Sequence, residues 1–150
     1  MIDLTTPIIP YEGTGIFKLD SSLDEVKALL KEHGILYDEE INVNRYNPED
    51  PPWIIIEIKN VMEFFFAKNR LFKIVLEGNF SGNLPNGINL DTTIDDARKI
   101  DPNLTFDDWD EIYVSTEGYW VDYDEDTKKL CWITIFIPAL ERDDFFEYKW

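Results

Sequence analysis

An internal repeat constrains this chain more than any other feature. The segment FKLDSSLDEVKALL at residues 17–30 returns as INLDTTIDDARKID at residues 88–101, with the Leu-Asp pair, the hydroxyl residue and the acidic residue at matching positions. Repeated supersecondary units usually stack and bury a face that one unit alone leaves exposed. We therefore expect one compact domain over residues 1–150, built of two repeats at about 15–77 and 87–138 with a C-terminal tail at 139–150.

Each copy carries the signature of a helix start. Ser22 and Glu25 form a capping box before a run of apolar residues at helical spacing, and Gly34 suits the left-handed position that ends a helix. This pattern predicts a helix over residues 22–33. In the second copy Thr93 predicts a helix through about Ile100.

Strand-rich stretches follow each predicted helix. They lie at 41–46, 53–59, 62–68 and 71–76 in the first copy and at 111–115, 119–123 and 130–138 in the second. Short connections favour antiparallel pairing, because parallel strands need crossovers of a dozen or more residues. The expected fold class is α+β: two related units of capped helix followed by antiparallel strands, with the helices packed on one face of the sheet.

Three segments outside these elements also have an expected conformation. Residues 1–15 contain two prolines and two glycines and are typical of an extended leader. Thr105 is expected to cap a short helical turn that carries Phe106 and Trp109. The tail, which ends in FFEYKW, is expected to be a short helical or docked segment.

The charge of the chain is strongly acidic. The formal net charge is −17, and residues 101–126 contain ten acidic residues and no Lys or Arg. Such a field disfavours nucleic acid and anionic membrane surfaces, whose binding depends on cationic side chains. It favours fast association with a basic protein, or it serves only to keep the chain dispersed.

The sequence indicates a cytoplasmic protein. Cys131 is the one cysteine, so an internal disulfide is excluded and a reducing compartment fits. The first residues show neither the basic region nor the continuous apolar run of a signal peptide, and no apolar run is long enough to span a membrane.

No catalytic or metal motif emerges. The run Asp122, Asp124, Asp126 resembles the start of a calcium loop, but Thr127 stands where that loop needs Gly, and Ile133 stands where it needs Glu. The acidic cluster at 107–111 is more typical of a solvated surface than of paired catalytic carboxylates. We therefore expect no enzymatic activity, no cofactor and no metal. The open alternative is a hydrolase that uses the carboxylates of 107–111 and 122–126.

Alternation along the strands carries the strongest functional signal. Successive strand residues point to opposite faces of a sheet, so rows of aliphatic residues separate from rows that mix aromatic and acidic residues. The mixed rows predict a partner-binding surface, because aromatic anchors dominate the energy of many interfaces. Its expected residues are Glu57, Phe65, Trp120, Asp122, Trp132 and Phe136. The alternative is that the leader or the tail covers these aromatics.

The two copies also resemble a known family. Residues 87–100 followed by 118–137, and more loosely 15–30 followed by 62–76, share a short strand from Gly-Ile to Leu, a capped helix and an antiparallel meander. This pattern resembles the tandem repeats of β-lactamase-inhibitor-protein-like and BamE-like domains. The resemblance implies helices on one side of a sheet whose concave side grips a partner protein.

Size, acidity and aromatic surface together predict a non-enzymatic protein-binding module. The favoured function is a bacterial immunity protein or inhibitor that neutralises a basic toxin or enzyme. The alternative is a structural or adaptor subunit whose acidity serves only solubility.

Overall fold

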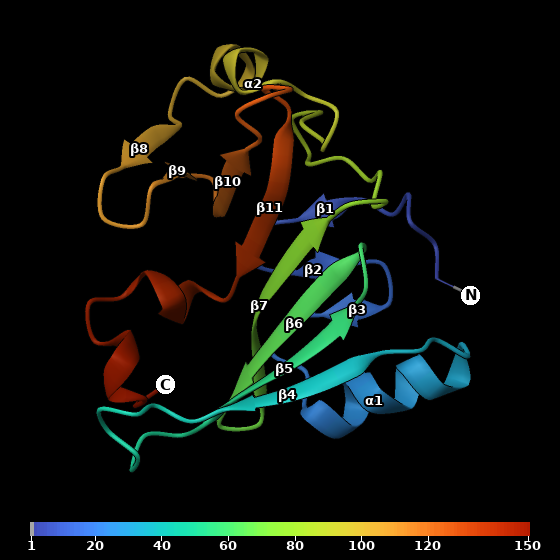
Figure 1. The fold of residues 1–150 in the computed structure, drawn as a ribbon, viewed down its shortest axis with the longest axis vertical. Helices are drawn as coiled ribbons and strands as arrows, with labels where there is room; N and C mark the ends of the chain where they lie inside the picture. Colours follow the sequence, from blue (N-terminus) through green and yellow to red (C-terminus); the bar gives the residue numbers. More distant parts are fainter. Residues whose placement is uncertain (1) are drawn as a thin grey trace.

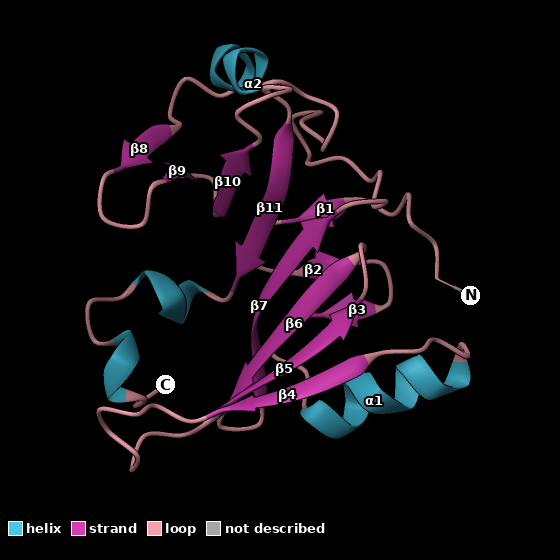
Figure 2. Cartoon of the chain, in the orientation of Figure 1, coloured by secondary structure: helices cyan, strands magenta, loops and turns pink. Residues whose placement is uncertain are grey.

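The computed structural model describes residues 2–150, which form two antiparallel sheets (Figures 1 and 2). The small sheet has the order β1-β2-β3, and the large sheet has the order β4-β5-β6-β7-β11-β10-β9-β8. The strands are β1 (Ile8–Ile9), β2 (Gly13–Thr14), β3 (Phe17–Lys18), β4 (Asp38–Asn42), β5 (Trp53–Ile58), β6 (Met62–Ala67), β7 (Arg70–Glu77), β8 (Thr105–Asp107), β9 (Ile112–Ser115), β10 (Tyr119–Tyr123) and β11 (Leu130–Phe136).

Both α-helices begin where the sequence predicts. Helix α1 (Leu23–Glu32) starts after Ser22, whose hydroxyl accepts a hydrogen bond from the Glu25 amide at 3.2 Å. Helix α2 (Ile94–Ile100) starts after Thr93, whose hydroxyl accepts from the Asp96 amide at 3.2 Å. These caps satisfy amides that a helix start leaves unpaired.

The large sheet joins the two halves of the chain through their last strands. Strands β4 to β7 form one meander and strands β8 to β11 form another, and β7 pairs with β11 at the centre of the sheet. Helix α1 precedes the first meander and α2 precedes the second. The division into repeats at about 15–77 and 87–138 stays a prediction.

The two faces of the large sheet differ in chemistry. One row across five paired strands consists of buried side chains: Ile56, Phe64, Ile74, Ile135 and Tyr119. The next row, which points to the opposite face, consists of Glu57, Glu63, Val75, Thr134 and Trp120. We call this second side the open face.

The leader, taken from here on as residues 2–18 so that it includes β3, helps to cover the buried face of the large sheet. Strand β3 brings the Phe17 ring to 4.8 Å from the Phe64 ring, and the Ile8 amide donates to the Asn83 carbonyl at 2.9 Å. Gly13, with φ +142°, is required between β1 and β3, because a Cβ there would lie 2.2 Å from the Phe17 carbonyl oxygen. The leader therefore forms part of the core as a small sheet of its own.

The predicted α+β fold class, with helices packed on one face of the sheet, is wrong, because the protein is mostly β. Helix α1 has 10 residues and α2 has 7. At about 1.5 Å per residue, α1 is only about 15 Å long. The eight strands of the large sheet, about 4.8 Å apart, span about 34 Å, so a helix of this length covers only part of the sheet. The helices bury only Val26, Leu30, Ile94 and Ala97, so strands of the leader cover much of what helices were expected to cover.

Two local predictions also fail. The segment after Leu104 is strand β8 and not a helical turn, because Phe106 pairs with Tyr113 of β9 and packs against its ring at 5.3 Å. Strand β4 covers 38–42 and not 41–46. Its polar residues give no apolar alternation, so pairing with β5 alone defines it.

The C-terminal segment docks on the large sheet as two short 3₁₀ turns, η1 (Pro138–Glu141) and η2 (Phe145–Glu147). The Phe145 ring stacks on the Trp150 ring at 5.0 Å and packs against Phe72 of β7 at 5.3 Å. The Trp53 indole donates to the Tyr148 hydroxyl at 3.0 Å. The segment therefore closes one end of the open face, at the lower left of Figure 1.

Candidate functional site

The open face contains a cavity of about 420 Å³. Its lining includes Leu140 and Phe146 of the C-terminal segment, and Asp110 and Ile112 near the start of β9. The remaining lining residues come mainly from the central strands and are Trp53, Glu63, Lys73, Val75, Trp120, Val121, Asp122, Trp132 and Thr134.

Three of the six predicted binding residues line this cavity: Trp120, Asp122 and Trp132. Asp122 is the cross-strand partner of Trp132, so the carboxylate and the indole are neighbours on one face. Trp132 is 46% exposed, and Trp120 is half-buried. An indole that keeps half of its surface in water has area left for a partner to bury.

Phe65 and Phe136 point to the same face, where Phe65 is half-buried and Phe136 is covered. Phe136 is fully buried, because the Trp120 ring lies 4.6 Å from it and the Tyr11 ring of the leader lies 6.0 Å from it. Phe65 packs edge-on against Trp53 at 6.2 Å. Phe136 therefore supports the face from within, whereas Phe65 and Trp132 keep exposed area.

Glu57 belongs to a carboxylate triad on the open face. One oxygen from each of Glu57, Glu63 and Glu77 lies within 4.8 Å of the other two. Burial, followed by the neighbouring carboxylates of Glu77 and Glu57, raises the pKa of Glu63 above its usual range. Carboxylate oxygens are also the ligands that a cation such as Ca²⁺ takes, with water completing the set. The triad gives this side of the face a concentrated negative potential.

Lys73 is the one cation among the residues that line the cavity. Its Nζ lies 4.0 Å from the centroid of the Phe65 ring and 5.7 Å from that of Trp53. Burial lowers the pKa of its ammonium group. Lys73 was not among the residues predicted from the sequence, although alternation along the predicted strand at 71–76 separates it from Phe72 and Ile74. The strand register places it beside Phe65 and Phe136.

The acidic segments considered for hydrolysis build turns. The Asp107 carboxylate accepts from the amides of Trp109 and Asp110 at 2.9 and 3.2 Å. The Asp124 carboxylate accepts from the amides of Asp126 and Thr127 at 2.8 and 3.0 Å, and these bonds lower its pKa. Both carboxylates therefore have a local structural role.

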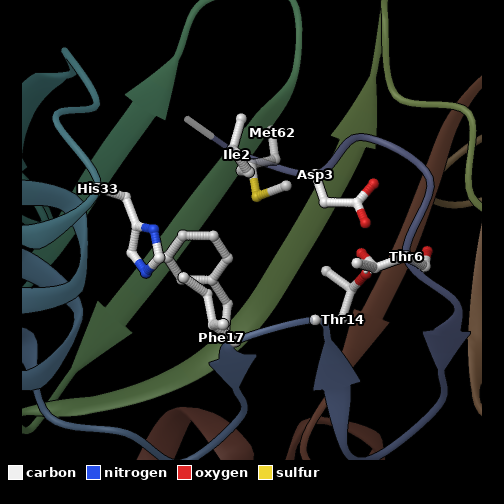
Figure 3. Close-up of a pocket in the computed structure, with 9 residues that line it drawn as sticks. Ile2, Asp3, Thr6, Thr14, Phe17, His33 and Met62 are labelled. Atoms are coloured by element: carbon white, nitrogen blue, oxygen red, sulfur yellow. Dashed lines mark hydrogen bonds between the residues drawn. The ribbon is translucent and has the colours of Figure 1, made fainter.

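A second cavity, of about 260 Å³, lies between the leader and the end of α1 (Figure 3). The His33 imidazole lies beside the Phe17 ring, and Asp3 stands at the other side of the cavity. The Asp3 carboxylate accepts from the Thr5 amide and hydroxyl at 2.8 and 2.6 Å, and the hydroxyls of Thr6 and Thr14 bond at 2.9 Å. Its polar groups thus hold the leader together, and we place the candidate site at the open face.

Comparison of the chain with protein-family models, curated proteins and solved structures finds no match. The resemblance to β-lactamase-inhibitor-protein-like and BamE-like domains stays a prediction. Among the described residues, no helix is both long and apolar enough to cross a membrane.

Proposed function

We propose that this protein is a non-enzymatic binding module that neutralises a basic protein, in the manner of an immunity protein or an inhibitor. One observation carries the proposal: a half-exposed indole, Trp132, stands at a cavity of the open face beside the carboxylate of Asp122. Aromatic anchors surrounded by charged rims are typical of protein–protein interfaces.

The partner is a protein with a cationic surface. The chain carries a net charge of −17, and the cavity lining adds Glu63, Asp110 and Asp122 against the single cation Lys73. An enzyme that acts on nucleic acid needs a cationic groove for phosphates. An acidic protein can occupy such a groove with fast association that weakens as salt rises.

Two kinds of residue on the open face contribute to the proposed binding. Trp132 and Trp120 supply apolar area that a partner desolvates, and the Glu57–Glu63–Glu77 triad and Asp122 supply charge for Lys or Arg side chains. We place this binding in the cytoplasm, where the unpaired thiol of Cys131 suits the reducing conditions.

The test begins with a partner captured from the organism that encodes the chain and then titrated in isolation. Trp132→Ala is expected to weaken binding by more than about 1 kcal/mol, the usual threshold for a contributing interface residue. Ile100→Ala on α2 is the matched control, because Ile100 is also 46% exposed and lies outside the cavity lining. The Asp122→Asn variant and a series of salt concentrations test how much charge contributes to binding of the partner.

Two results would contradict the proposal. Equal affinities of the Trp132→Ala and Ile100→Ala variants for the partner would show that the open face is not part of the interface. Binding that is insensitive to salt would instead favour an adaptor whose acidity serves solubility.

A further inference from the structure

The large sheet ends in an edge strand without a strand beside it. Within residues 2–150, β4 (Asp38–Asn42) pairs only with β5, and all five of its residues are exposed. In an antiparallel edge strand, alternate amides and carbonyls point outward, away from the neighbouring strand. Such an edge is a template for another strand, and proteins usually shorten, twist or cover it.

Exposed apolar side chains gather at this edge. Leu36 is 91% exposed, Ile41 is 62% exposed and Tyr46 is fully exposed, and Tyr37 and Val43 are also exposed. These five residues lie within 36–46, on β4 and its two flanks. Val43 and Tyr46 also line a hollow with Trp53, Phe146 and Tyr148, so apolar area on this side of the sheet is open to a partner.

The two faces of β4 differ in what they offer to an added strand. Asp38 pairs with Glu57 and Glu40 pairs with Ile55, so both carboxylates lie on the open face. They help to line a hollow of about 150 Å³ together with Glu57 and Glu63. Ile41 points to the opposite face, where Glu39 is already paired with Lys27 at 2.5 Å.

A second copy of this chain does not suit the edge. Two β4 strands paired antiparallel in full register would place the two Glu40 side chains opposite each other, next to the Asp38 side chains on the same face. Like charges across a strand pair destabilise it. The same carboxylates favour a strand that carries Lys or Arg on the open face.

We propose that β4 binds an extended segment of a basic partner by strand addition, with Lys or Arg side chains facing Asp38 and Glu40 and apolar side chains facing Ile41. Main-chain hydrogen bonds give such a complex its affinity, and the alternating side chains give it specificity. The recognised segment therefore alternates basic and apolar residues. This inference concerns the edge of the sheet and goes beyond the binding proposed for the cavity.

The probe is a synthetic octapeptide of alternating Lys and Val, compared with a peptide of the same composition in blocks, Lys₄Val₄. Hydrogen exchange of the protein is followed by NMR with and without each peptide. The alternating peptide is expected to slow exchange of outward amides in 38–42, while the block peptide is expected to leave them unchanged. Equal effects of the two peptides, or protection confined to other strands, would overturn the proposal.

The paired substitution Asp38→Lys with Glu40→Lys tests the charge term. It is expected to weaken binding of the alternating peptide at least about tenfold, which corresponds to about 1.4 kcal/mol. The matched control is Asp95→Lys with Glu125→Lys, which makes the same charge change at exposed positions of α2 and of the β10–β11 turn. Equal losses in the two double variants would show a general charge effect and overturn the proposal.

Two further measurements separate this inference from its alternatives. Trp132→Ala is expected to leave peptide binding at β4 unchanged, so the edge and the cavity can fail independently. Sedimentation of the protein without peptide is expected to give a monomer. A dimer with protected amides in 38–42 would assign the edge to a second copy and overturn the proposal.

Discussion

The ammonium group of Lys73 lies over the ring of Phe65, with Nζ 4.0 Å from the ring centroid, on a face whose other charged lining residues are carboxylates. A cation at this distance is attracted to the ring quadrupole, an interaction of about 0.5–2 kcal/mol. Burial lowers the pKa of Lys73, while Glu63 and Asp110 oppose that shift. Lys73 therefore serves as an internal counter-charge to the acidic face.

Replacing Lys73 with Met is expected to raise the pKa of Glu63 further. The Lys73 charge is the one influence that lowers this pKa, while burial, Glu77 and Glu57 raise it. The pKa is measured by following the Glu63 carboxyl carbon through an NMR titration. Lys73→Arg keeps the charge and is expected to leave the Glu63 pKa near its original value. If the Glu63 pKa is the same in Lys73→Met as in the wild type, the Lys73 charge does not act on Glu63 and the prediction is wrong.

Replacing Glu63 with Gln is expected to stabilise the fold at pH 7. Because the folded pKa of Glu63 is raised, the folded state binds more protons than the unfolded state above the usual pKa of 4.5. The free energy of unfolding therefore falls as pH rises from below 4.5 through the raised folded pKa, so the ionised carboxylate costs stability above that range. Gln removes the charge and this cost.

Urea denaturation at pH 7 and at pH 4 measures the effect of Glu63→Gln. We expect a higher midpoint than in the wild type at pH 7 and a smaller difference at pH 4, where Glu63 is protonated in the wild type. Glu125→Gln, in an exposed turn, is the control and is expected to shift neither midpoint. A lower midpoint for Glu63→Gln at pH 7 would mean that hydrogen bonds of the carboxylate outweigh the repulsion.

The sequence predicted the parts of this fold that local chemistry determines. The caps at Ser22 and Thr93 need only the next three residues, and both helices begin at the expected place. The strand over 119–123 was predicted with its observed bounds, because its alternation and its turns lie within the segment itself.

Non-local pairing decided the parts that were wrong or missing. The leader becomes a sheet because Ile8 meets Asn83 and Phe17 meets Phe64. Strand β4 has no apolar alternation and is held by β5. Such contacts join residues far apart in the sequence, so a local pattern carries no signal of them.

The candidate site also combines features that the local sequence predicts with features that depend on distant parts of the chain. Alternation placed all six predicted residues on one face, as the strand register has them. It did not indicate which of them the ends of the chain cover. Tyr11 reaches Phe136 from the leader, and Phe146 reaches the cavity from the C-terminal segment.

The neighbouring residues Phe145 and Phe146 are expected to differ sharply in their effect on stability. Phe145 is buried and stacks on Trp150, whereas Phe146 is exposed at the edge of the cavity. Phe145→Ala is expected to cost about 3–5 kcal/mol, as for other buried aromatic residues. Phe146→Ala is expected to stay within about 0.5 kcal/mol. Urea denaturation of both variants measures the difference, and equal costs would argue against docking of the tail.

The buried carboxylate of Asp101 is held by hydroxyl groups. Ser115 Oγ donates to it at 2.6 Å, and the Tyr119 hydroxyl, which accepts from Asn86 at 3.2 Å, donates to the same oxygen. Burial raises the pKa of Asp101, but these hydrogen bonds and one from the Asn103 amide outweigh it, so the pKa is lowered. The Asp101 contribution to stability is therefore present above its usual pKa of 3.8 and is lost as pH falls through the folded pKa.

Replacing Tyr119 with Phe is expected to destabilise the fold by about 1–3 kcal/mol at pH 7, because it leaves a buried carboxylate with one donor fewer. The pKa of Asp101 is expected to rise, so less stability is lost in acid than in the wild type. Burial, followed by the Asp101 hydrogen bond, raises the pKa of Tyr119 in the folded state. The unfolded state then loses the phenolic proton first, and stability falls as pH rises above about 10. The Phe variant lacks this alkaline loss.

Urea denaturation of Tyr119→Phe across the pH range tests both effects. Tyr113→Phe is the control, because within residues 2–150 the Tyr113 hydroxyl makes no hydrogen bond while its ring packs against Phe106 and Tyr123. The Tyr113 variant is expected to keep the wild-type acid profile. If both variants lose the same stability and share one acid profile, the Tyr119 hydroxyl does not hold the Asp101 charge, and the low pKa rests on Ser115 and the Asn103 amide.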